Sequence, residues 1–429
     1  MLDIKYIREN LDAVKKAAQV KRVSVDLDQL IAVDDQRREK LQKVEAIRAD
    51  KNKSSGEIPK LQGAEKQALL DKMKAYTEEE KQLDEDLKII ETEFIALMLR
   101  VPAVPSEKAP VGKDDSENVE LYKVGTPRVF TDFTPKDHVT LGEELDIIDI
   151  PRGTKIAGAR NYFLKGDALL LENAVMRFTI DHLMAKGFIP FSVPMLVNND
   201  TMTGTGYFPG GEESAYKIER DDLNLIGTSE VSVTSYHRDE ILTEEELPKL
   251  YAGYSSCFRR EAGTYGKDTR GLYRVHQFQK VEQVVVCKNS EEESQKMFDL
   301  LLTNAKEILE KLGLAYRVVA VCTGDMGQGQ VYKNDIETWM PSRQGYGETH
   351  SCSMFYEFQA RRLNLRYKDE KGKTQFAHTL NNTAIASPRV LIPLLECYQN
   401  KDGSITIPEA LRPYMNGRTK IEKKIEKKV

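Results

Sequence analysis

The sequence has few of the residues that crosslink chains or gather around metal ions. Its five cysteines are spread along the 429-residue chain and form no Cys-x-x-Cys pair. The six histidines form no His-x-His or His-x-x-x-His pair. These patterns exclude a disulfide framework and a zinc knuckle, so we expect reduced thiols, no zinc and a cytoplasmic protein.

Long apolar runs and an excess of basic residues are also missing. The longest apolar runs, such as residues 318–322, are far too short to cross a bilayer. Residues 1–10 have neither the apolar core of a secretion signal nor the acid-poor composition of a transit peptide. With 63 basic and 68 acidic residues the net charge is −5, which excludes a globally basic nucleic-acid binder but not a local basic patch.

The first hundred residues carry a heptad pattern. Apolar side chains recur at alternating steps of four and three at Leu69, Met73, Tyr76, Leu83, Leu87, Ile90, Phe94 and Leu97. A looser version lies upstream, and residues 54–59 between the two stretches are helix breakers. The pattern predicts an antiparallel coiled-coil hairpin over about 27–99, with Pro59 near the start of the second helix. A helix over 66–99 would reach roughly 50 Å.

This hairpin has two interpretations. A heptad segment alone favours a dimerisation coiled coil. Residues 36–60, however, hold eight Lys or Arg against four acids, so the tip of the hairpin is locally basic in an acidic protein. A charge run is usually a solvated face, but a basic tip also suits an anionic partner.

The rest of the chain has the composition of a compact mixed domain. Residues 101–135 are polar and rich in Pro, Gly and Asp, which is typical of a linker. Strand-like runs follow at 188–197, 223–226, 251–258, 272–287, 316–322 and 352–358. Few full helices separate them, which favours an α+β fold with a largely antiparallel sheet and flanking helices. We therefore expect an N-terminal domain (1–105), a linker (106–135), a main domain (136–418) and a disordered Lys-rich tail (419–429).

The densest group of candidate functional residues lies in residues 257–282. The pattern there predicts a strand, a glycine-rich loop and a second strand. Arg259 and Glu261 share one face of the first strand, and Lys280 and Glu282 share one face of the second. A buried arginine or carboxylate is costly unless it meets a charged ligand, and a planar guanidinium suits phosphate. A hairpin with surface salt bridges is the alternative.

Residues 258–282, with the pattern FRxEAG…GxDTxGLxRxHQFxKVE, resemble motif 2 of the class II aminoacyl-tRNA synthetases, specifically of the seryl-tRNA synthetase family. Residues 158–194 resemble motif 1, the dimer element, and residues 378–389 resemble motif 3. Residues 228–230 resemble the Thr-x-Glu loop of the family, and 237–242, 322–327 and 351–362 match further signatures. With the N-terminal hairpin, the resemblance covers nearly the whole chain.

The resemblance implies a class II catalytic domain and a tRNA-binding N-terminal arm. The implied reaction is ATP-dependent serine–tRNA ligation, in which L-serine is activated to seryl-adenylate and transferred to the 3′ end of tRNA(Ser), and of tRNA(Sec) where present. ATP as substrate, Mg²⁺ and a homodimer through motif 1 come with it. Two alternatives remain: an armless-type ligase that loads carrier proteins, and a non-catalytic tRNA-binding or scaffold paralogue. The intact arm and the retained Arg259, Glu261, Glu282 and Arg389 weigh against them.

The resemblance also implies residue roles. Arg259 and Arg389 are the catalytic pair, on the α- and γ-phosphates, and Glu348 and Ser351 hold magnesium. The ATP site comprises Arg259, Arg260, Glu261, Val275, Glu348, Thr349, His350, Ser351 and Arg389. The serine pocket comprises Thr228, Ser229, Glu230, Glu282 and Thr383. The tRNA-binding residues are Arg37, Arg38, Lys40, Lys43, Arg48, Lys51 and Lys53.

Elementary chemistry agrees with this set of roles. A serine carboxylate is already ionised at neutral pH, so its activation needs alignment and charge neutralisation and no general base. The chain departs from the family pattern at Gly227, His350 and Asn382. Thr383 keeps a hydroxyl where the family has serine. The glycine-rich residues 204–211 lack the Lys-Ser/Thr ending of a phosphate loop, and we interpret them as a lid near the amino-acid pocket.

Overall fold

The structure is a computed structural model that describes residues 1–263, 266 and 270–423. The chain divides into two compact units, Met1–Pro102 and Ala103–Val429, and each is described by itself. Within the described residues, no helix is both long and apolar enough to cross a membrane.

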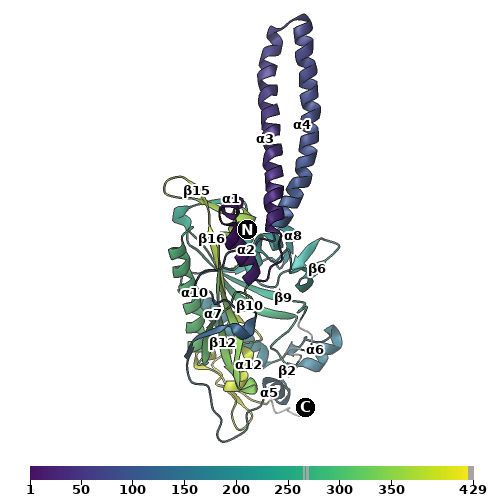
Figure 1. Cartoon of the computed structure of the whole chain (residues 1–429). Coiled ribbons are helices and arrows are strands. Elements are labelled where there is room, and N and C mark those ends of the chain that lie inside the picture. The colour runs from purple at the N-terminus through teal and green to yellow at the C-terminus, as the bar shows by residue number, and fades with distance from the viewer. Residues whose placement is uncertain (264–265, 267–269, 424–429) are drawn as a thin grey trace. The chain divides into compact units, whose positions relative to one another are not determined.

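The first unit is helical and contains the predicted hairpin (Figure 1). Its elements are α1 (Ile4–Glu9), α2 (Leu11–Val20), α3 (Leu27–Glu57), the 3₁₀ turn η1 (Ile58–Lys60) and α4 (Gly63–Met98). Asp26 begins α3 by accepting a hydrogen bond from the Gln29 N–H at 2.8 Å, which satisfies an otherwise unpaired donor. The helix does not stop at the predicted breaker cluster but continues to Glu57. Pro59 lies in the turn, and the second helix begins at Gly63, after Pro59 but before the start at residue 66 that the length estimate used.

The seam between α3 and α4 (the arm) follows the predicted heptads. The heptad residues of α4 are buried or half-buried, whereas most of its other residues are exposed. Val44 and Ile47 of α3 and Leu87 of α4 are buried. Glu80 fills the apolar gap in the pattern and forms ion pairs across the seam with Arg48 and Lys51, both at 2.7 Å. These cross-helix pairs confirm the antiparallel arrangement.

The second unit is built on an eight-stranded sheet with the order β1-β11-β12-β13-β16-β10-β9-β4. The strands are β1 (Val119–Val124), β4 (Ile189–Ser192), β9 (Lys249–Phe258), β10 (Gln277–Cys287), β11 (Tyr316–Ala320), β12 (Tyr332–Met340), β13 (Gly345–Tyr356) and β16 (His378–Ala386). Neighbours pair antiparallel except β4 and β9, which run parallel. The predicted α+β class with a largely antiparallel sheet is confirmed.

Several boundaries differ from the prediction. The run 188–197 forms β4 in the main sheet and β5 (Leu196–Asn198) in a small sheet with β6 (Tyr216–Ile218) and β7 (Leu223–Leu225). The expected linker 106–135 contributes β1 to the edge of the main sheet, since Val119–Val124 pairs with β11. In the expected disordered tail, β18 (Lys420–Ile421) pairs with β17 (Ile405–Thr406). Residues 424–429 of that tail lie outside the described residues.

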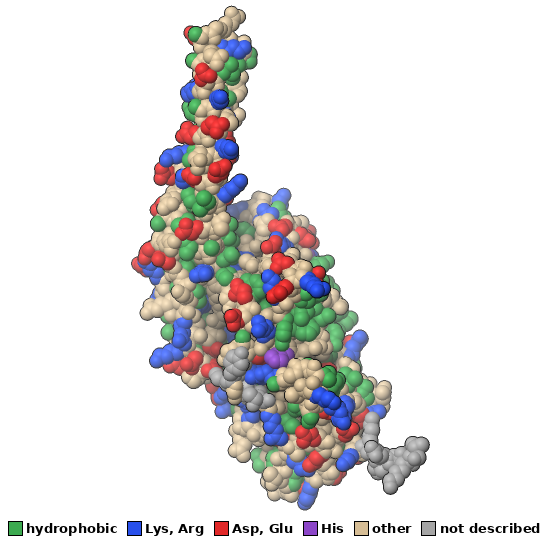
Figure 2. All heavy atoms as spheres, turned by 90° about the vertical axis from the view of Figure 1, so that its right-hand side faces the viewer, with side chains coloured by type: hydrophobic (Ala, Val, Ile, Leu, Met, Phe, Trp, Pro, Cys, Tyr) green, Lys and Arg blue, Asp and Glu red, His purple; other side chains and the backbone are tan. Residues whose placement is uncertain are grey.

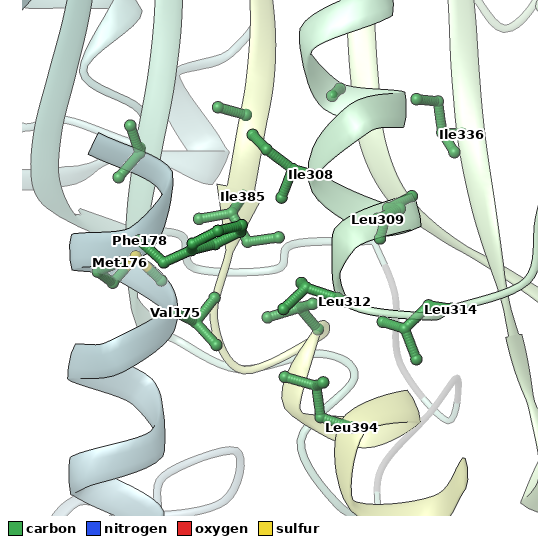
Figure 3. Close-up of a cluster of buried hydrophobic side chains, with 14 of the residues drawn as sticks. Val175, Met176, Phe178, Ile308, Leu309, Leu312, Leu314, Ile336, Ile385 and Leu394 are labelled. Carbon is green, nitrogen blue, oxygen red and sulfur yellow. The ribbon is translucent and has the colours of Figure 1, made fainter. Parts of the chain in front are cut away.

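Helices α7 (Asp167–Ala185) and α10 (Glu291–Lys311) pack on the central strands β10, β13 and β16. Figure 3 shows Val175 and Phe178 of α7 facing Ile308 of α10 and Leu312, which directly follows α10, across Ile385 of β16. Burial of each such side chain stabilises the fold by roughly 1.5–3 kcal/mol. This core holds rigid the strands that carry the polar side chains described next.

The smaller elements that position the site are short. They are α5 (His138–Glu144), α8 (Asn199–Thr205), α9 (Glu230–Thr234), the turn η6 (Pro341–Arg343), α11 (Phe358–Leu363) and α12 (Leu391–Cys397). Val281 and Val285 of β10 enter the hydrophobic core, whereas Lys280 and Glu282 line a cavity. The alternation of side chains along a strand thus separates the core from the site.

Candidate active site

A cavity of about 230 Å³ brings together most of the residues predicted from the sequence. Those that line it are Thr228, Glu230, Arg259, Glu261, Val275, Glu282, Glu348, Thr349, Ser351, Thr383 and Arg389. They come from segments that are distant in the sequence. Adjacent strands β13, β16, β10 and β9 carry most of them or end beside them.

Three predicted residues do not line this cavity. Ser229 is fully buried, and its hydroxyl donates to the carbonyl of Gly253 on β9 at 2.9 Å. Arg260 is exposed. His350 is buried on β13, and burial lowers its pKa to about 4, so the ring is neutral near pH 7. Ser229 and His350 therefore support strands of the site. Residues 264, 265 and 267–269 of the motif 2 loop lie outside the described residues.

Arg389, just after β16, anchors one part of the cavity. Its Nη1 lies 3.2 Å from Oε2 of Glu348, and its Nε donates to the carbonyl of Tyr273 at 3.0 Å. The guanidinium also stacks over the Tyr273 ring, 4.6 Å from the centroid. Burial would raise the pKa of Glu348, but the positive charges of Arg389, Lys333 and Arg259 lower it to about 2. Glu348 is therefore an ionised oxygen donor.

Arg259 follows β9 and is fixed from two sides. Its Nε donates to the Gly227 carbonyl at 3.2 Å, and its guanidinium lies 5.3 Å from the centroid of the Phe278 ring. Glu261 takes a left-handed backbone conformation, with φ of 54°, directly after the strand. Its carboxylate accepts a hydrogen bond from Arg274 at 3.0 Å. The strand end thus presents a guanidinium and a carboxylate to the same cavity.

A second group of side chains is acidic and buried. On β10, Glu282 forms an ion pair with Lys280 at 2.6 Å and accepts from the Thr383 hydroxyl at 3.2 Å. Glu230 begins α9 and accepts from the Tyr207 hydroxyl at 3.3 Å. Burial and the nearby negative charge of Glu282 raise the pKa of Glu230 to about 7. These carboxylates are arranged to receive a cation.

Gln359 of α11 holds the second oxygen of Glu230. Its Nε2 donates to Oε1 of Glu230 at 2.8 Å and to the Thr205 carbonyl at 3.0 Å. The Thr379 hydroxyl in turn donates to Oε1 of Gln359 at 2.6 Å. Because every polar atom of this buried amide side chain is used, the Glu230 carboxylate has one fixed orientation.

Sequence reasoning missed several residues that line the cavity. They are Tyr207, Tyr273, Arg274, Phe278, Lys280, Gln330, Lys333, Ser353, Asn381, Ala386, Ser387 and Pro388. The alternation that placed Lys280 beside Glu282 was a usable signal for Lys280. Tyr207 lies in the glycine-rich segment interpreted as a lid near the amino-acid pocket. Nothing in the sequence pattern indicated that Lys333 would line the cavity, because its strand β12 was not predicted.

Lys333 is half-buried beside the carboxylates of the cavity. Its Nζ lies 3.1 Å from Oδ2 of Asp335. Burial would lower the pKa of Lys333, but Asp335 and Glu348 raise it above its ordinary value. Among the described residues, no group of three or more His, Cys, Asp or Glu side chains is arranged so that it could hold a metal ion.

Two stretches of the chain match known protein families. Residues 1–105 match the family described as the seryl-tRNA synthetase N-terminal domain. Residues 216–398 match the family described as the class II tRNA synthetase core domain (G, H, P, S and T). A serine–tRNA ligase of Deinococcus radiodurans is 50% identical over 97% of this chain and 98% of its own length. A serine–tRNA ligase of Carboxydothermus hydrogenoformans is 46% identical over 99% of this chain and 100% of its own length.

Solved structures give the same result. The crystal structure of a seryl-tRNA synthetase from Pyrococcus horikoshii, complexed with ATP, superposes with a TM-score of 0.91. It is 36% identical and covers 99% of this chain and 100% of its own. Near-complete coverage at these identities includes both the helical arm and the catalytic core. The chain therefore belongs to the seryl-tRNA synthetase family.

Proposed function

We propose that the cavity activates L-serine with ATP and that the seryl group is then transferred to the 3′ end of serine tRNA in the cytoplasm. The observation that carries this proposal is the pairing of two clusters in one cavity. Arg259, Arg389 and Glu348 form a cluster suited to a metal-bound triphosphate. Glu230, Glu282 and Thr383 form one suited to an ammonium and a hydroxyl.

The activation step needs charge neutralisation more than proton transfer. The ionised carboxylate of serine is itself the nucleophile that attacks the α-phosphate, and pyrophosphate leaves. Arg259, held by the Gly227 carbonyl and the Phe278 ring, would neutralise charge at the α-phosphate. Arg389 would bind the γ-phosphate. Both guanidiniums are already held in place, so little reorganisation is needed at the moment of reaction.

Magnesium fits the donors that the site offers. Glu348 supplies an ionised carboxylate, and Ser351 supplies a hydroxyl from the same strand. Oxygen donors of this type suit Mg²⁺, which usually completes its shell with phosphate oxygens and water. The metal would supply further neutralisation of the triphosphate charge.

Serine selection would come from the buried acidic cluster. Glu230 would accept hydrogen bonds from the ammonium group, and the Glu282–Thr383 pair would meet the serine hydroxyl. Alanine would leave this pair without its ligand partner, and a site built for a hydroxyl rejects an analogue that lacks one.

The function is tested by ATP–pyrophosphate exchange with each standard amino acid in turn. Exchange should depend on serine and on Mg²⁺. Exchange that is absent with serine, or equally fast with another amino acid, would contradict the proposal. Transfer to purified serine tRNA should follow in the same preparation, which separates a ligase from a non-catalytic paralogue.

We propose that two copies of the chain associate through the motif 1 region. Strand β4 is an edge of the main sheet, and large apolar side chains in and near motif 1 are exposed. They are Phe163, Leu169, Met184, Ile189, Met195 and Leu196. An apolar edge strand is normally paired or covered. Ile189→Asp should shift the mass in light scattering from dimer to monomer, whereas Val129→Asp, at an exposed site outside motif 1, should not.

We propose that the arm binds serine tRNA. Basic and acidic side chains interleave along it (Figure 2), and five predicted tRNA-binding residues already form ion pairs. They are Arg37, Lys40, Lys43, Arg48 and Lys51. Arg38 and Lys53 are exposed and make no ion pair with another described residue. Because exposed ion pairs contribute only about 0–1 kcal/mol, phosphates can compete for all seven, and most readily for Arg38 and Lys53.

The partition of the arm and the site between subunits can be tested by mixing variants. A subunit without the arm combined with an Arg259→Ala subunit should charge tRNA if each arm serves the partner's site. A heterodimer that exchanges pyrophosphate but charges no tRNA would show instead that each arm serves its own site.

A further inference from the structure

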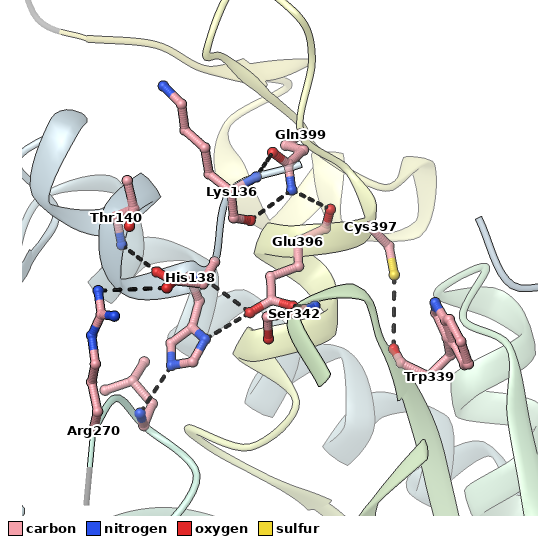
Figure 4. A network of polar contacts seen from close by, with 11 residues as sticks. Lys136, His138, Thr140, Arg270, Trp339, Ser342, Glu396, Cys397 and Gln399 are labelled. Atoms are coloured by element: carbon pink, nitrogen blue, oxygen red, sulfur yellow. Dashed lines mark hydrogen bonds and ion pairs between the residues drawn. The ribbon is translucent and has the colours of Figure 1, made fainter. Parts of the chain in front are cut away.

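A buried carboxylate and an imidazole meet between α12 and α5 (Figure 4). Glu396 of α12 is fully buried and His138, the first residue of α5, is 8% exposed. Oε1 of Glu396 accepts from the His138 backbone N–H at 3.0 Å and contacts Nδ1 of the His138 ring at 2.7 Å. Its other oxygen, Oε2, accepts from the backbone N–H of Ser342 in η6 at 2.9 Å. We call His138 and Glu396 the clasp.

The far side of the imidazole fixes its tautomer. Nε2 of His138 lies 3.1 Å from the backbone N–H of Leu272, which can only donate. Nε2 must therefore be the acceptor, so Nδ1 carries the proton and donates to Glu396. A β-carbon on Gly271 would lie 2.3 Å from this nitrogen, and the residue has φ of +83°. Glycine at this position thus allows the ring to reach the backbone of the segment that precedes β10.

The clasp accepts hydrogen bonds from the backbone N–H groups of Leu272 and Ser342. The residues that follow these two in the chain, Tyr273 and Arg343, pack their side chains together. Leu272 precedes Tyr273, whose ring has the Arg389 guanidinium 4.6 Å from its centroid. Ser342 precedes Arg343, whose guanidinium lies 4.1 Å from the same centroid. The Tyr273 carbonyl also accepts from Arg389 Nε. The clasp therefore fixes the backbone on which Tyr273 and Arg343 are mounted.

The clasp does not contact the substrate cavity. Of the described residues that line that cavity, none belongs to the clasp, whereas Tyr273 lines it. Tyr273, His138 and Ser342 line a separate cavity of about 230 Å³. Any effect of the clasp on ATP therefore passes through Tyr273, which lines both cavities, and Arg343 beside it, or along α12, which begins two residues after Arg389.

The geometry points to His138 and Glu396 as positioning residues that hold Arg389 in register with the triphosphate of ATP. This inference rests on the proposed role of Arg389. It predicts a selective effect, because the serine-binding residues Glu230, Glu282 and Thr383 bond Tyr207, Gln359 and one another, and not the clasp. A misplacement of about 1 Å can cost roughly 10²-fold in rate, so a displaced Tyr273 carbonyl is enough to weaken ATP use.

The principal test is His138→Asn, assayed by pyrophosphate exchange. The Asn amide can replace the Nδ1–H donor to Glu396 but is too short to reach Leu272. The KM for ATP should rise roughly tenfold, as expected for one lost hydrogen bond, while the KM for serine changes less than about twofold. His138→Gln places an amide oxygen near the position of Nε2 and should restore part of the ATP affinity.

The control is Gln399→Met. Gln399 is buried in the same network and bonds the main chain of Lys136 and the main-chain carbonyl of Glu396, but it contacts neither the Glu396 carboxylate nor Leu272 or Ser342. This variant should lose thermal stability and keep the KM for ATP. If His138→Asn raises both KM values equally, or neither, the inference is wrong.

Two further variants separate the possible failures. Arg389→Ala should itself raise the KM for ATP; if it does not, the proposed role of Arg389 fails. If it does and His138→Asn changes nothing, only the clasp inference fails. If His138→Asn does not fold, Gly271→Ala disturbs the same contact through the Nε2 side, and an unchanged KM for ATP in that variant overturns the inference.

Discussion

Thr383 on β16 donates a hydrogen bond to Glu282 on the neighbouring strand β10, with 3.2 Å between Thr383 Oγ1 and Glu282 Oε2. The two residues face each other in the antiparallel register of the sheet. Lys280 contacts the same carboxylate oxygen at 2.6 Å. The carboxylate is thus oriented by the sheet itself, before any substrate arrives, which favours selective binding of a hydroxyl group.

We expect Thr383→Val to weaken the preference for serine over alanine. The substitution removes the hydroxyl and keeps the shape, so the ratio of kcat/KM values for serine and alanine should fall by about tenfold. Thr383→Ser keeps the hydroxyl and should retain the preference. Exchange assays with both amino acids check this, and an unchanged ratio in the Val variant would assign Thr383 a structural role.

We expect Arg259→Ala to lower serine-dependent pyrophosphate exchange by about 10²–10³, because one preorganised donor to developing charge has roughly that effect. Arg260→Ala is the matched control. Its side chain is exposed and lies outside the cavity lining, so exchange should stay within a few-fold of wild type. Retention of more than a tenth of the activity in Arg259→Ala would show that Arg259 does not have the proposed role in serine activation.

We expect serine binding to weaken as the pH falls through 7. Burial and Glu282 raise the pKa of Glu230 to about 7 in the empty site, and only the ionised carboxylate can pair with the ammonium. Below that pH the proton must be lost on binding. The KM for serine should therefore be about tenfold higher at pH 6 than at pH 8.

Glu230→Gln supplies the control for this pH profile. The amide does not titrate, so any pH dependence that arises from ATP or from other residues persists in the variant. An identical profile for the variant and the wild type would show that Glu230 does not titrate near neutral pH.

We expect the arm to matter for tRNA charging and not for serine activation. Lys40 of α3 and Asp86 of α4 meet across the seam at 2.6 Å, so residues 41–85 can be replaced by a short glycine bridge between them. Pyrophosphate exchange should remain near the wild-type rate, while charging should fall steeply through a higher KM for tRNA. Loss of exchange in a folded variant would contradict an arm that serves tRNA alone.

A milder variant tests the charges. Arg38→Glu combined with Lys53→Glu should raise the KM for tRNA. The slope of the logarithm of the binding constant against the logarithm of the salt concentration should become shallower by about one for each lost phosphate contact. Equal salt slopes for variant and wild type would show that these two side chains do not meet phosphate.

The arm was predictable because its order is local. A heptad pattern needs only the partner helix that follows it in the chain, and the apolar spacing from Leu69 to Leu97 specifies which face is buried. The exact turn was not predictable, because α3 runs on through Ser54 to Glu57. The position of a helix end depends on small free-energy differences between neighbouring backbone conformations, which sequence patterns describe poorly.

The main sheet was predictable only where its strands are apolar. Strands β12 and β16 were missed, since residues such as Lys333, Asp335, Asn381 and Thr383 do not look like buried strand residues. Thr383 is buried because its hydroxyl bonds Glu282 on the adjacent strand β10, a partner that is distant in sequence, whereas Lys333 and Asp335 pair with each other along β12.

By itself, the sequence determined the class of fold, the family resemblance and about half of the side chains that line the cavity, because motif residues and apolar periodicity are written locally. Tertiary structure alone decided which of those side chains face the cavity. It turned Ser229 and His350 into supports, and brought in Tyr207, Lys333 and the Gln359 bridge to Glu230. The physical reason is that burial, charge compensation and hydrogen bonding are properties of neighbours in space, and the sheet creates those neighbours only after the chain has folded.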